Sequence, residues 1–397
     1  MPIKKYYSAL PHWNIHYQKV LLRVDLNVPL DNTKILDDTK LHAIRPTLDY
    51  LIAQKTTIIM LTHIGRPKGF DFQLSTKHLL PWFYKHHYTI TFAQTIKDVQ
   101  DLLYKHTSTI ILLENLRFFP GETSHEIHFA QSLKILGDYF VHDGFACMHN
   151  NDTSNTTLPL LFDTEHKTIG LYTQQELNRL ETQIQHIQSP FVVILGGSKL
   201  NTKIEYINHF IDKADACIIC PALAFTFLEA QGIAIGNSLV YDDCLQKAYT
   251  IIQKTIRHGI PFIMPKDIQI EENHAYRVVP VNEIPSTARG ISIGPQTLAS
   301  IEPIINNAHT IVYNGAIGFI DQIETLQGMK ALLLQLKKSN AHTIVCGGDT
   351  TAIVHKFGME NSYSYLSAGG GVILAYMVYH TLPALQALNI MDRNLID

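Results

Sequence analysis

Two lysines and two glycines that follow an apolar run could together bind a phosphate group. Phe191–Leu195 is continuously apolar, which favours a strand buried on both faces of a sheet. Two glycines end this run, and Lys199–Phe210 then has the spacing of a helix. Free backbone N–H groups at the start of a helix attract anions. Lys199 and Lys203 stand four residues apart, so on a helix they share one face beside such an anion. One turn of this kind, taken alone, is more often an ordinary connection with solvated lysines.

The same design recurs three times toward the C-terminus, and this repetition favours a functional site. Thr310–Gly315, Thr343–Thr350 and Tyr365–Gly371 each contain a short apolar run followed by glycine. Asp349 directly follows a glycine pair, where its carboxylate could hold Mg²⁺ through oxygen. No Walker A motif is present, because Gly196–Lys199 lacks the four-residue spacer. We therefore predict that the second half of the chain binds a nucleotide polyphosphate with its metal.

The first half of the chain carries arginines and histidines, with few acids, after its apolar runs. Planar guanidinium groups bind phosphate and carboxylate groups through paired hydrogen bonds. This half therefore suits a small polyanion. The residues concerned lie in four stretches, Arg23–Asn27, Thr62–Arg66, Glu114–Arg117 and His142–His149. Any one stretch could be a solvated loop, but all four at successive strand ends indicate a binding site.

The elements that must position these residues alternate along the chain. Short strands separated by helical stretches such as Leu41–Ala53 and His128–Leu136 predict parallel sheets with helices on both faces. Ligands bind beyond the carboxyl ends of the strands in such sheets. Thr173–Gln188 is polar and favours a helix, so we expect a helical linker between two α/β domains. The predicted strands are Val20–Val24, Thr57–Leu61, Thr89–Phe92, Thr109–Leu113 and Tyr139–Val141, then Phe191–Leu195, Ala216–Ile219, Pro261–Met264, Thr310–Tyr313 and Thr343–Cys346.

Length and composition agree with a two-domain enzyme. A chain of 397 residues exceeds the usual size of a single core. The balance of 32 basic and 35 acidic residues excludes a nucleic-acid footprint. Five dispersed cysteines indicate a reducing cytoplasm, and no apolar stretch is long enough to span a membrane. Cys217 and Cys220 match Cys-x-x-Cys but lie in an apolar run, so we interpret them as structural.

Taken in order, the motifs resemble phosphoglycerate kinase over nearly the whole chain. They are Arg23–Pro29, Thr62–Pro67, Leu113–Phe118, Ile194–Lys199, Gly347–Thr350 and Gly369–Gly371. The resemblance implies two Rossmann-like domains, each a parallel sheet with helices on both faces, joined by a helical hinge. Residues 1–170 would bind phosphoglycerate, residues 171–188 would form the linker helix, and residues 189–379 would bind the nucleotide. A C-terminal segment, about residues 380–397, would pack back on the first domain.

The implied reaction moves a phosphoryl group from 1,3-bisphosphoglycerate to MgADP, giving 3-phosphoglycerate and MgATP. Such a transfer needs positioning and positive charge more than a covalent partner. We expect a cytoplasmic monomer whose partners are these small substrates and Mg²⁺, with no nucleic-acid or membrane partner.

The resemblance also assigns residues to the two sites. The phosphoglycerate site would comprise Asp25, Leu26, Asn27, Lys40, His63, Ile64, Gly65, Arg66, Arg117, His149 and Asn150. The nucleotide site would comprise Gly197, Ser198, Lys199, Lys203, Gly290, Asn314, Asp321, Gly347, Gly348, Asp349 and Thr350, with Asp349 on the metal. The catalytic role would fall to Lys40, Lys199, Lys203, Gly348 and Gly370.

The chain departs from the family pattern at several site positions, which leaves two interpretations. Lys40 and Asn150 stand where the family has arginines, and Cys220–Ala222 stands where glycines line the adenine pocket. Asp321, Ala316 and Ser292 replace a glutamate, a proline and an aspartate. One interpretation is a working but slower phosphoglycerate kinase. The other is a non-catalytic descendant that binds nucleotide or phosphoglycerate as a regulatory or interaction protein. The retained lysines and Asp349 favour the first.

Overall fold

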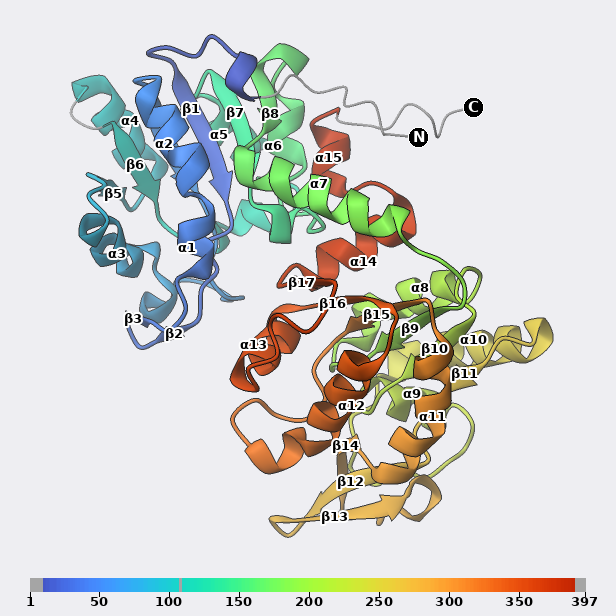
Figure 1. Ribbon diagram of the computed structural model, residues 1–397. Helices are drawn as coiled ribbons and strands as arrows, with labels where there is room; N and C mark the ends of the chain where they lie inside the picture. Colours follow the sequence, from blue (N-terminus) through green and yellow to red (C-terminus); the bar gives the residue numbers. More distant parts are fainter. Residues whose placement is uncertain (1–9, 107–108, 390–397) are drawn as a thin grey trace. The chain divides into compact units, whose positions relative to one another are not determined.

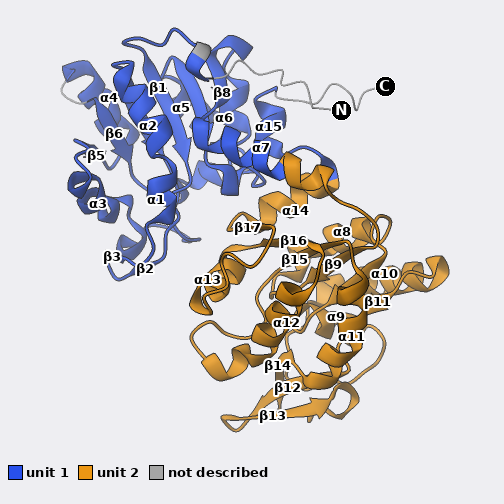
Figure 2. Cartoon of the chain, viewed as in Figure 1, with its two compact units in different colours: residues 1–180, 379–397 blue, residues 181–378 orange. Residues whose placement is uncertain are grey.

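The computed structural model describes residues 10–106 and 109–389, which form two compact units (Figure 2). Unit 1 runs to Leu180 and takes up the chain again at Tyr379, and unit 2 is Glu181–Val378. The chain thus leaves unit 1, builds unit 2 and returns. Residues 390–397 of the predicted C-terminal segment lie outside the described residues.

Unit 1 contains a parallel sheet of six strands flanked by helices (Figure 1). Its strand order is β5-β6-β4-β1-β7-β8, so strands from distant parts of the sequence are neighbours. The strands are β1 (Lys19–Val24), β4 (Thr57–Leu61), β5 (Thr91–Ala93), β6 (Ile110–Leu113), β7 (Tyr139–Asp143) and β8 (Lys167–Ile169). The helices are α1 (Thr39–Ala43), α2 (Arg45–Ala53), α3 (Leu80–Lys85), α4 (Ile96–Lys105), α5 (Ile127–Lys134), α6 (Thr157–Leu160), α7 (Leu171–Gln185, which continues into unit 2) and α15 (Pro383–Ala387).

The central strands of this sheet are buried on both faces, as their continuous apolar runs predict. Residues 20–24 of β1 and residues 58–61 of β4 are all buried. The pairing of β1 with both β4 and β7 is parallel, with Arg23 opposite Leu61 on one side and His142 on the other. Arg23, the second-last residue of the strand, is therefore carried into the interior.

Unit 2 contains a second parallel sheet of six strands, in the order β11-β10-β9-β15-β16-β17 (Figure 1). Its strands are β9 (Phe191–Leu195), β10 (Ala216–Ile219), β11 (Phe262–Ile263), β15 (Thr310–Asn314), β16 (His342–Cys346) and β17 (Tyr365–Ser367). Its helices are α8 (Leu200–Phe210), α9 (Leu223–Glu229), α10 (Leu245–His258), α11 (Pro295–Asn307), α12 (Gln327–Lys338), α13 (Gly348–Lys356) and α14 (Gly370–Tyr379). The predicted fold class, two parallel α/β sheets, is confirmed.

The predicted helix over Leu41–Ala53 is wrong in one respect, because the structure has two helices there. α1 ends at Ala43, and α2 begins at Arg45 with Pro46 in its first turn. A proline has no N–H to donate, and its ring clashes with the carbonyl four residues earlier, so it starts a helix more readily than it continues one.

Short antiparallel elements were not predicted. Unit 2 carries a three-stranded sheet of β12 (Asp267–Glu272), β13 (Ala275–Pro280) and β14 (Arg289–Ile293), and unit 1 has a hairpin of β2 (Leu30–Asp31) and β3 (Lys34–Ile35). The sequence does contain a signal for the three-stranded sheet. Ile268 and Ile270 alternate with polar residues, and the two-residue turn Asn273-His274 has positive φ at both positions.

Candidate active site

The polar residues of unit 1 gather at the carboxyl edge of its sheet. Asp25 follows β1, His63 follows β4, Asn115 and Arg117 follow β6, and His149 follows β7. These four strands are consecutive in the sheet, in the order β6-β4-β1-β7. Their loops therefore start side by side, which is where ligands bind in open parallel sheets.

Asp25 and Lys40 form a close ion pair at this edge. The Lys40 ammonium donates to Asp25 Oδ2 at 2.8 Å, and the backbone N–H of Asn27 donates to Oδ1 at 3.0 Å. Burial would raise the pKa of the Asp25 carboxyl, but Lys40 and His63 outweigh burial and lower it to about 2. Asp25 is therefore ionised at neutral pH and holds the ammonium of Lys40 in place.

Arg23 lies behind this pair and is fully buried. Its Nε donates to Ser154 Oγ at 2.8 Å, and its Nη2 lies 3.1 Å from His63 Nδ1. Burial and the neighbouring guanidinium lower the pKa of His63 well below its usual range. The same causes lower the pKa of His142 to about 3. These imidazoles are neutral at neutral pH, so the positive charge at this edge comes from arginine and lysine.

Asn115 shapes the loop that carries His63, Gly65 and Arg66. Its Oδ1 accepts from the N–H of Ile64 at 3.2 Å, and its Nδ2 donates to the carbonyl of Ile64 at 2.8 Å. Asn27 Oδ1 accepts from the N–H of Gly65 at 2.9 Å. These contacts fix the backbone of Ile64 and Gly65, and Arg66 beyond them is exposed.

Arg117 is held by two acceptors of the protein itself. Its Nη1 donates to the carbonyl of Gly65 at 2.7 Å, and its Nη2 donates to Asp152 Oδ2 at 3.2 Å. His149 and Asn150 lie in the same loop as Asp152 and are partly buried. The structure thus brings the predicted phosphoglycerate residues to one edge and adds an acid that was not predicted.

The glycine loops of unit 2 meet at the carboxyl edge of its own sheet. Gly315 follows β15 with φ of +109°, and a Cβ built on it would lie 2.1 Å from the Gly196 carbonyl oxygen. A Cβ on Gly370 would lie 2.6 Å from Gly347 Cα. The Gly315 N–H donates to Thr350 Oγ1 at 3.0 Å. Side chains are therefore excluded where the loops after β9, β15, β16 and β17 come together.

The two lysines of unit 2 have different surroundings. α8 begins at Leu200, one residue later than predicted, so Lys199 precedes the helix and its side chain is exposed. The ammonium of Lys203 donates to the carbonyl of Gly196 at 2.7 Å. Burial lowers the pKa of Lys203 to about 8, with the charge of Lys199 acting in the same direction. Lys203 thus places its ammonium beneath the glycine loops.

Asp349 lies in the first turn of α13 and is exposed. No group of three or more His, Cys, Asp or Glu side chains in the described part of the chain could hold a metal ion by itself. A single carboxylate at a strand end fits Mg²⁺ that arrives with a nucleotide, because this ion uses one or two carboxylates together with substrate phosphates.

Two predicted nucleotide residues, Gly290 and Asp321, and the departing position Ala222 have surroundings of other kinds. Gly290 is in β14, where a Cβ would meet the ring of Phe225 at 2.1 Å. Asp321 is exposed in the loop before Ile323. Ala222, just after the buried Cys220, has φ of 71° and ψ of −51°. That conformation suits glycine, so the substitution at this position leaves a strained residue before α9.

Sequence reasoning missed three residues of these sites. Arg23 was noted as part of a stretch but not assigned to the site, and its contacts with His63 and Ser154 depend on strand packing. Asp152 contacts Arg117 across 35 residues of sequence, for which no local signal exists. Tyr241 donates its hydroxyl to the carbonyl of Ser198 in the first glycine loop of unit 2.

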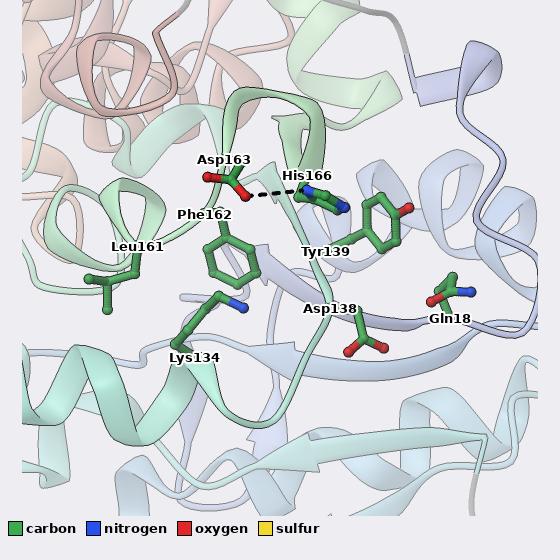
Figure 3. A pocket seen from close by; sticks show the side chains of 8 residues that line it. All are labelled: Gln18, Lys134, Asp138, Tyr139, Leu161, Phe162, Asp163 and His166. Atoms are coloured by element: carbon green, nitrogen blue, oxygen red, sulfur yellow. Dashed lines mark ion pairs between the residues drawn. The ribbon is translucent and has the colours of Figure 1, made fainter.

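A surface pocket of about 380 Å³ lies at the other edge of the unit 1 sheet (Figure 3). Its lining residues are Gln18, Lys134, Asp138, Tyr139, Leu161, Phe162, Asp163 and His166. Gln18 and Asp138 immediately precede β1 and β7, which places the pocket at the amino ends of these strands. The Lys134 ammonium lies 4.1 Å from the centroid of the Phe162 ring, and His166 pairs with Asp163 at 4.0 Å. The charged groups are thus engaged locally, and this pocket is not the candidate site.

The fold consists of two α/β units, and each has a parallel sheet with polar residues at its carboxyl edge. The family model described as "Phosphoglycerate kinase" matches residues 10–378. The chain therefore belongs to the phosphoglycerate kinase family, the phosphotransferases that use a carboxyl group as acceptor.

Individual relatives agree over nearly the full length. A cytosolic phosphoglycerate kinase of Nicotiana tabacum is 33% identical over 406 residues, covering 98% of this chain and 100% of the relative. A phosphoglycerate kinase of Aquifex aeolicus is 34% identical, covering 94% of this chain and 96% of the relative. The solved structure of phosphoglycerate kinase from Coxiella burnetii is 30% identical with a TM-score of 0.73, covering 96% of this chain and 99% of that one.

Proposed function

We propose that this chain transfers a phosphoryl group reversibly from 1,3-bisphosphoglycerate to MgADP, with phosphoglycerate bound by unit 1 and the nucleotide by unit 2. The family membership supports the reaction. The assignment of phosphoglycerate to unit 1 and of the nucleotide to unit 2 is supported by the different residues at the carboxyl edges of the two sheets. One is rich in arginine, and the other combines glycine loops with two lysines.

The transfer breaks the bond between phosphorus and the carboxyl oxygen of the acyl phosphate, and it forms a bond to a terminal oxygen of the ADP β-phosphate. The carboxylate of 3-phosphoglycerate leaves. No covalent intermediate with the protein is required, so the contribution of the protein is positioning and charge. Lys199 and Lys203 supply cations near the moving phosphoryl group, and the first turn of α14 at Gly370 offers backbone N–H groups.

Asp349 would hold the Mg²⁺ of the nucleotide. When bound, this ion would neutralise the phosphate oxygens. The Asp349→Ala variant should bind MgADP more weakly than the parent protein and bind 3-phosphoglycerate equally well. Titration calorimetry with each ligand separately measures both quantities. Equal MgADP affinities in the two proteins would remove Asp349 from the metal site.

A coupled assay with 3-phosphoglycerate and MgATP tests the reaction itself. We expect turnover that disappears in the Lys203→Ala variant. A parent protein that binds both substrates in calorimetry but shows no turnover would instead be the regulatory binding protein that Lys40 and Asn150 leave open.

Localisation and oligomeric state complete the proposal. We propose a cytoplasmic monomer, in keeping with five unpaired, buried cysteines. Among the described residues, no helix is long and apolar enough to cross a membrane. Sedimentation velocity at several protein concentrations tests the monomer, and a mass near twice 44.9 kDa would contradict it.

A further inference from the structure

Arg117 and Asp152 form an ion pair inside the proposed phosphoglycerate site. Arg117 Nη2 donates to Asp152 Oδ2 at 3.2 Å, and the side chains are 12% and 10% exposed. Water screens a pair this enclosed much less than a surface pair. The arginine is thus neutralised by the protein before any substrate arrives.

The hydrogen-bond pattern of the guanidinium shows what the acid does there. The Gly65 carbonyl already orients the group by accepting from Nη1 at 2.7 Å. Nη2 and Nε form the side edge of the guanidinium, and Asp152 occupies Nη2. Nε is buried and has no hydrogen-bond partner among the described residues. A phosphate or carboxylate that binds this edge through two oxygens must compete with Asp152 for Nη2.

Among the described residues, Arg117 is the only hydrogen-bond partner of the Asp152 carboxylate. Its backbone carbonyl accepts from the N–H groups of Asn155 and Thr156, at 2.9 and 3.1 Å, and these contacts hold the loop. The side chain can therefore be changed while the loop keeps its backbone contacts. The negative charge of Asp152 also acts on the buried Arg23 guanidinium and raises its pKa, so the acid has a second cationic neighbour.

We propose that Asp152 is a positioning residue that holds Arg117 as an internal counterion, and that phosphoglycerate must displace it to bind. This inference rests on the proposed function, because it concerns the affinity of that site for its anionic substrate. Asp152 lowers this affinity in two ways. It competes with the ligand for one edge of the Arg117 guanidinium, and it holds the Arg117 side chain away from the ligand. The chain thus sets its substrate affinity with a residue that need not touch the substrate.

The Asp152→Asn variant tests the inference, because it removes the charge with little change of shape. Calorimetric titration with 3-phosphoglycerate should show about tenfold tighter binding than in the parent protein. In steady-state kinetics, KM for 3-phosphoglycerate should fall and KM for MgATP should stay unchanged. Thermal unfolding verifies the fold, and Asp152→Ser replaces the variant if the asparagine protein does not fold.

Two further proteins separate the possible causes. The Asp138→Asn variant removes an acid that pairs with Lys19 at 3.6 Å at the other edge of the sheet, and it should bind 3-phosphoglycerate like the parent. In an Arg117→Ala background, Asp152→Asn should no longer tighten binding, because the arginine through which it acts is gone.

The outcomes are distinct. Unchanged or weaker binding by Asp152→Asn overturns the inference and leaves the proposed function intact. Equal tightening in the Arg117→Ala background also overturns it, because the acid would then act directly on the ligand. If neither the parent nor the variant binds 3-phosphoglycerate, the proposed function fails and the inference fails with it.

Discussion

At the scale of single residues, the carboxyl edge of the unit 1 sheet holds two of its cations in internal ion pairs. Lys40 is bound to Asp25 and Arg117 to Asp152. A substrate anion must compete with these carboxylates or share the cations with them. Such an arrangement keeps the site ordered without ligand at the expense of affinity.

Lys40 is the first residue at which this arrangement can be tested. An ammonium has three donors, of which one is used by Asp25, whereas the family's arginine has a planar fork of five. We predict that Lys40→Arg raises kcat and that Lys40→Ala lowers it about ten- to a hundredfold, since losing one charge-assisted hydrogen bond costs about 1.5–3 kcal/mol. Steady-state rates with saturating substrates measure both changes.

Arg45 provides the matched control for Lys40. It belongs to the next helix, α2, and its Nε lies 3.4 Å from the hydroxyl of Tyr88. It therefore serves a different contact, and Arg45→Ala should leave kcat near the parent value. Parent-like turnover by Lys40→Ala would show that Lys40 carries no chemistry.

Lys203 gives a prediction for pH dependence. Its pKa is lowered by burial to about 8 from 10.5, so between these values the unfolded chain binds more protons than the folded one. Folding stability contributed by this group therefore rises as pH increases from about 8 to 10.5. Lys203→Met should be more stable than the parent at pH 7, by about 1–2 kcal/mol, and this difference should shrink above pH 10.

Urea unfolding of the ligand-free proteins at pH 7 and pH 10 measures the effect. Lys199→Met is the control, because the exposed Lys199 should show no such gain. The same Lys203→Met protein should lose most of its affinity for MgADP, since its cation is gone. A variant less stable than the parent at pH 7 would contradict the buried-charge explanation.

Candidate site residues could be named from the sequence, and their binding roles stay predictions. Arg117 belongs to a motif after a strand, whereas the roles of Lys40 and Lys203 were assigned through the family resemblance, and these lysines lie in α1 and α8. Their acceptors could not all be named, since Gly196 acts through a backbone carbonyl and Asp152 through a loop that only the fold brings near. Pairing of this kind depends on tertiary structure, which local patterns do not encode.

At the scale of secondary structure, α9 begins after a strained residue. Ala222 has φ of 71° at the cap of this helix, where glycine would be relaxed. We predict that Ala222→Gly stabilises the protein by roughly 0.5–2 kcal/mol, the relief of strain exceeding the added entropy of the unfolded chain. Thermal or urea unfolding measures the change.

The same variant tests the effect of this loop on the nucleotide. Pro221 and Ala222 add side chains, and the proline has no N–H, so the parent should discriminate weakly between ADP and GDP. Ala222→Gly should widen the preference for ADP if the family's glycines serve the adenine. If the parent protein prefers ADP over GDP by more than about a hundredfold, roughly 2.7 kcal/mol, the loop still discriminates between the two bases.

Elements with strong patterns were predicted well, and weakly patterned ones were missed. β4, β9 and β10 match their predicted bounds, because buried parallel strands are continuous apolar runs. β13 was missed because half of its residues are exposed and no long apolar run marks it. The break between α1 and α2 is signalled by Pro46 in the first turn of α2 and not by the hydrophobic periodicity.

At the scale of the whole molecule, the two ligand sets belong to different units. Transfer requires the acyl phosphate and the nucleotide to meet, so we predict that small-angle scattering shows a smaller radius of gyration only when both ligands are bound. Each ligand alone, at saturation, is the control. An unchanged radius with both ligands present would mean that catalysis needs no change of arrangement.

The return of the chain to unit 1 ties its last described helix to the first unit. Lys167, at the start of β8, is buried and donates to the carbonyls of Pro159 and Ala387, each at 3.0 Å. The N–H of Ala384 donates to the carbonyl of Met148 at 3.2 Å, next to His149. The end of the chain thus supports the loop that carries a proposed substrate residue.

This return has a consequence for biosynthesis. When the first 180 residues have left the ribosome, Lys167 still lacks one of its two acceptors and Met148 lacks its donor. At about 5–20 residues per second, adding unit 2 takes roughly 10–40 s. Unit 2 is one uninterrupted segment and can fold as it emerges, whereas unit 1 must wait for the residues after Val378. The nascent chain should therefore acquire the proposed nucleotide site before it completes the proposed phosphoglycerate site.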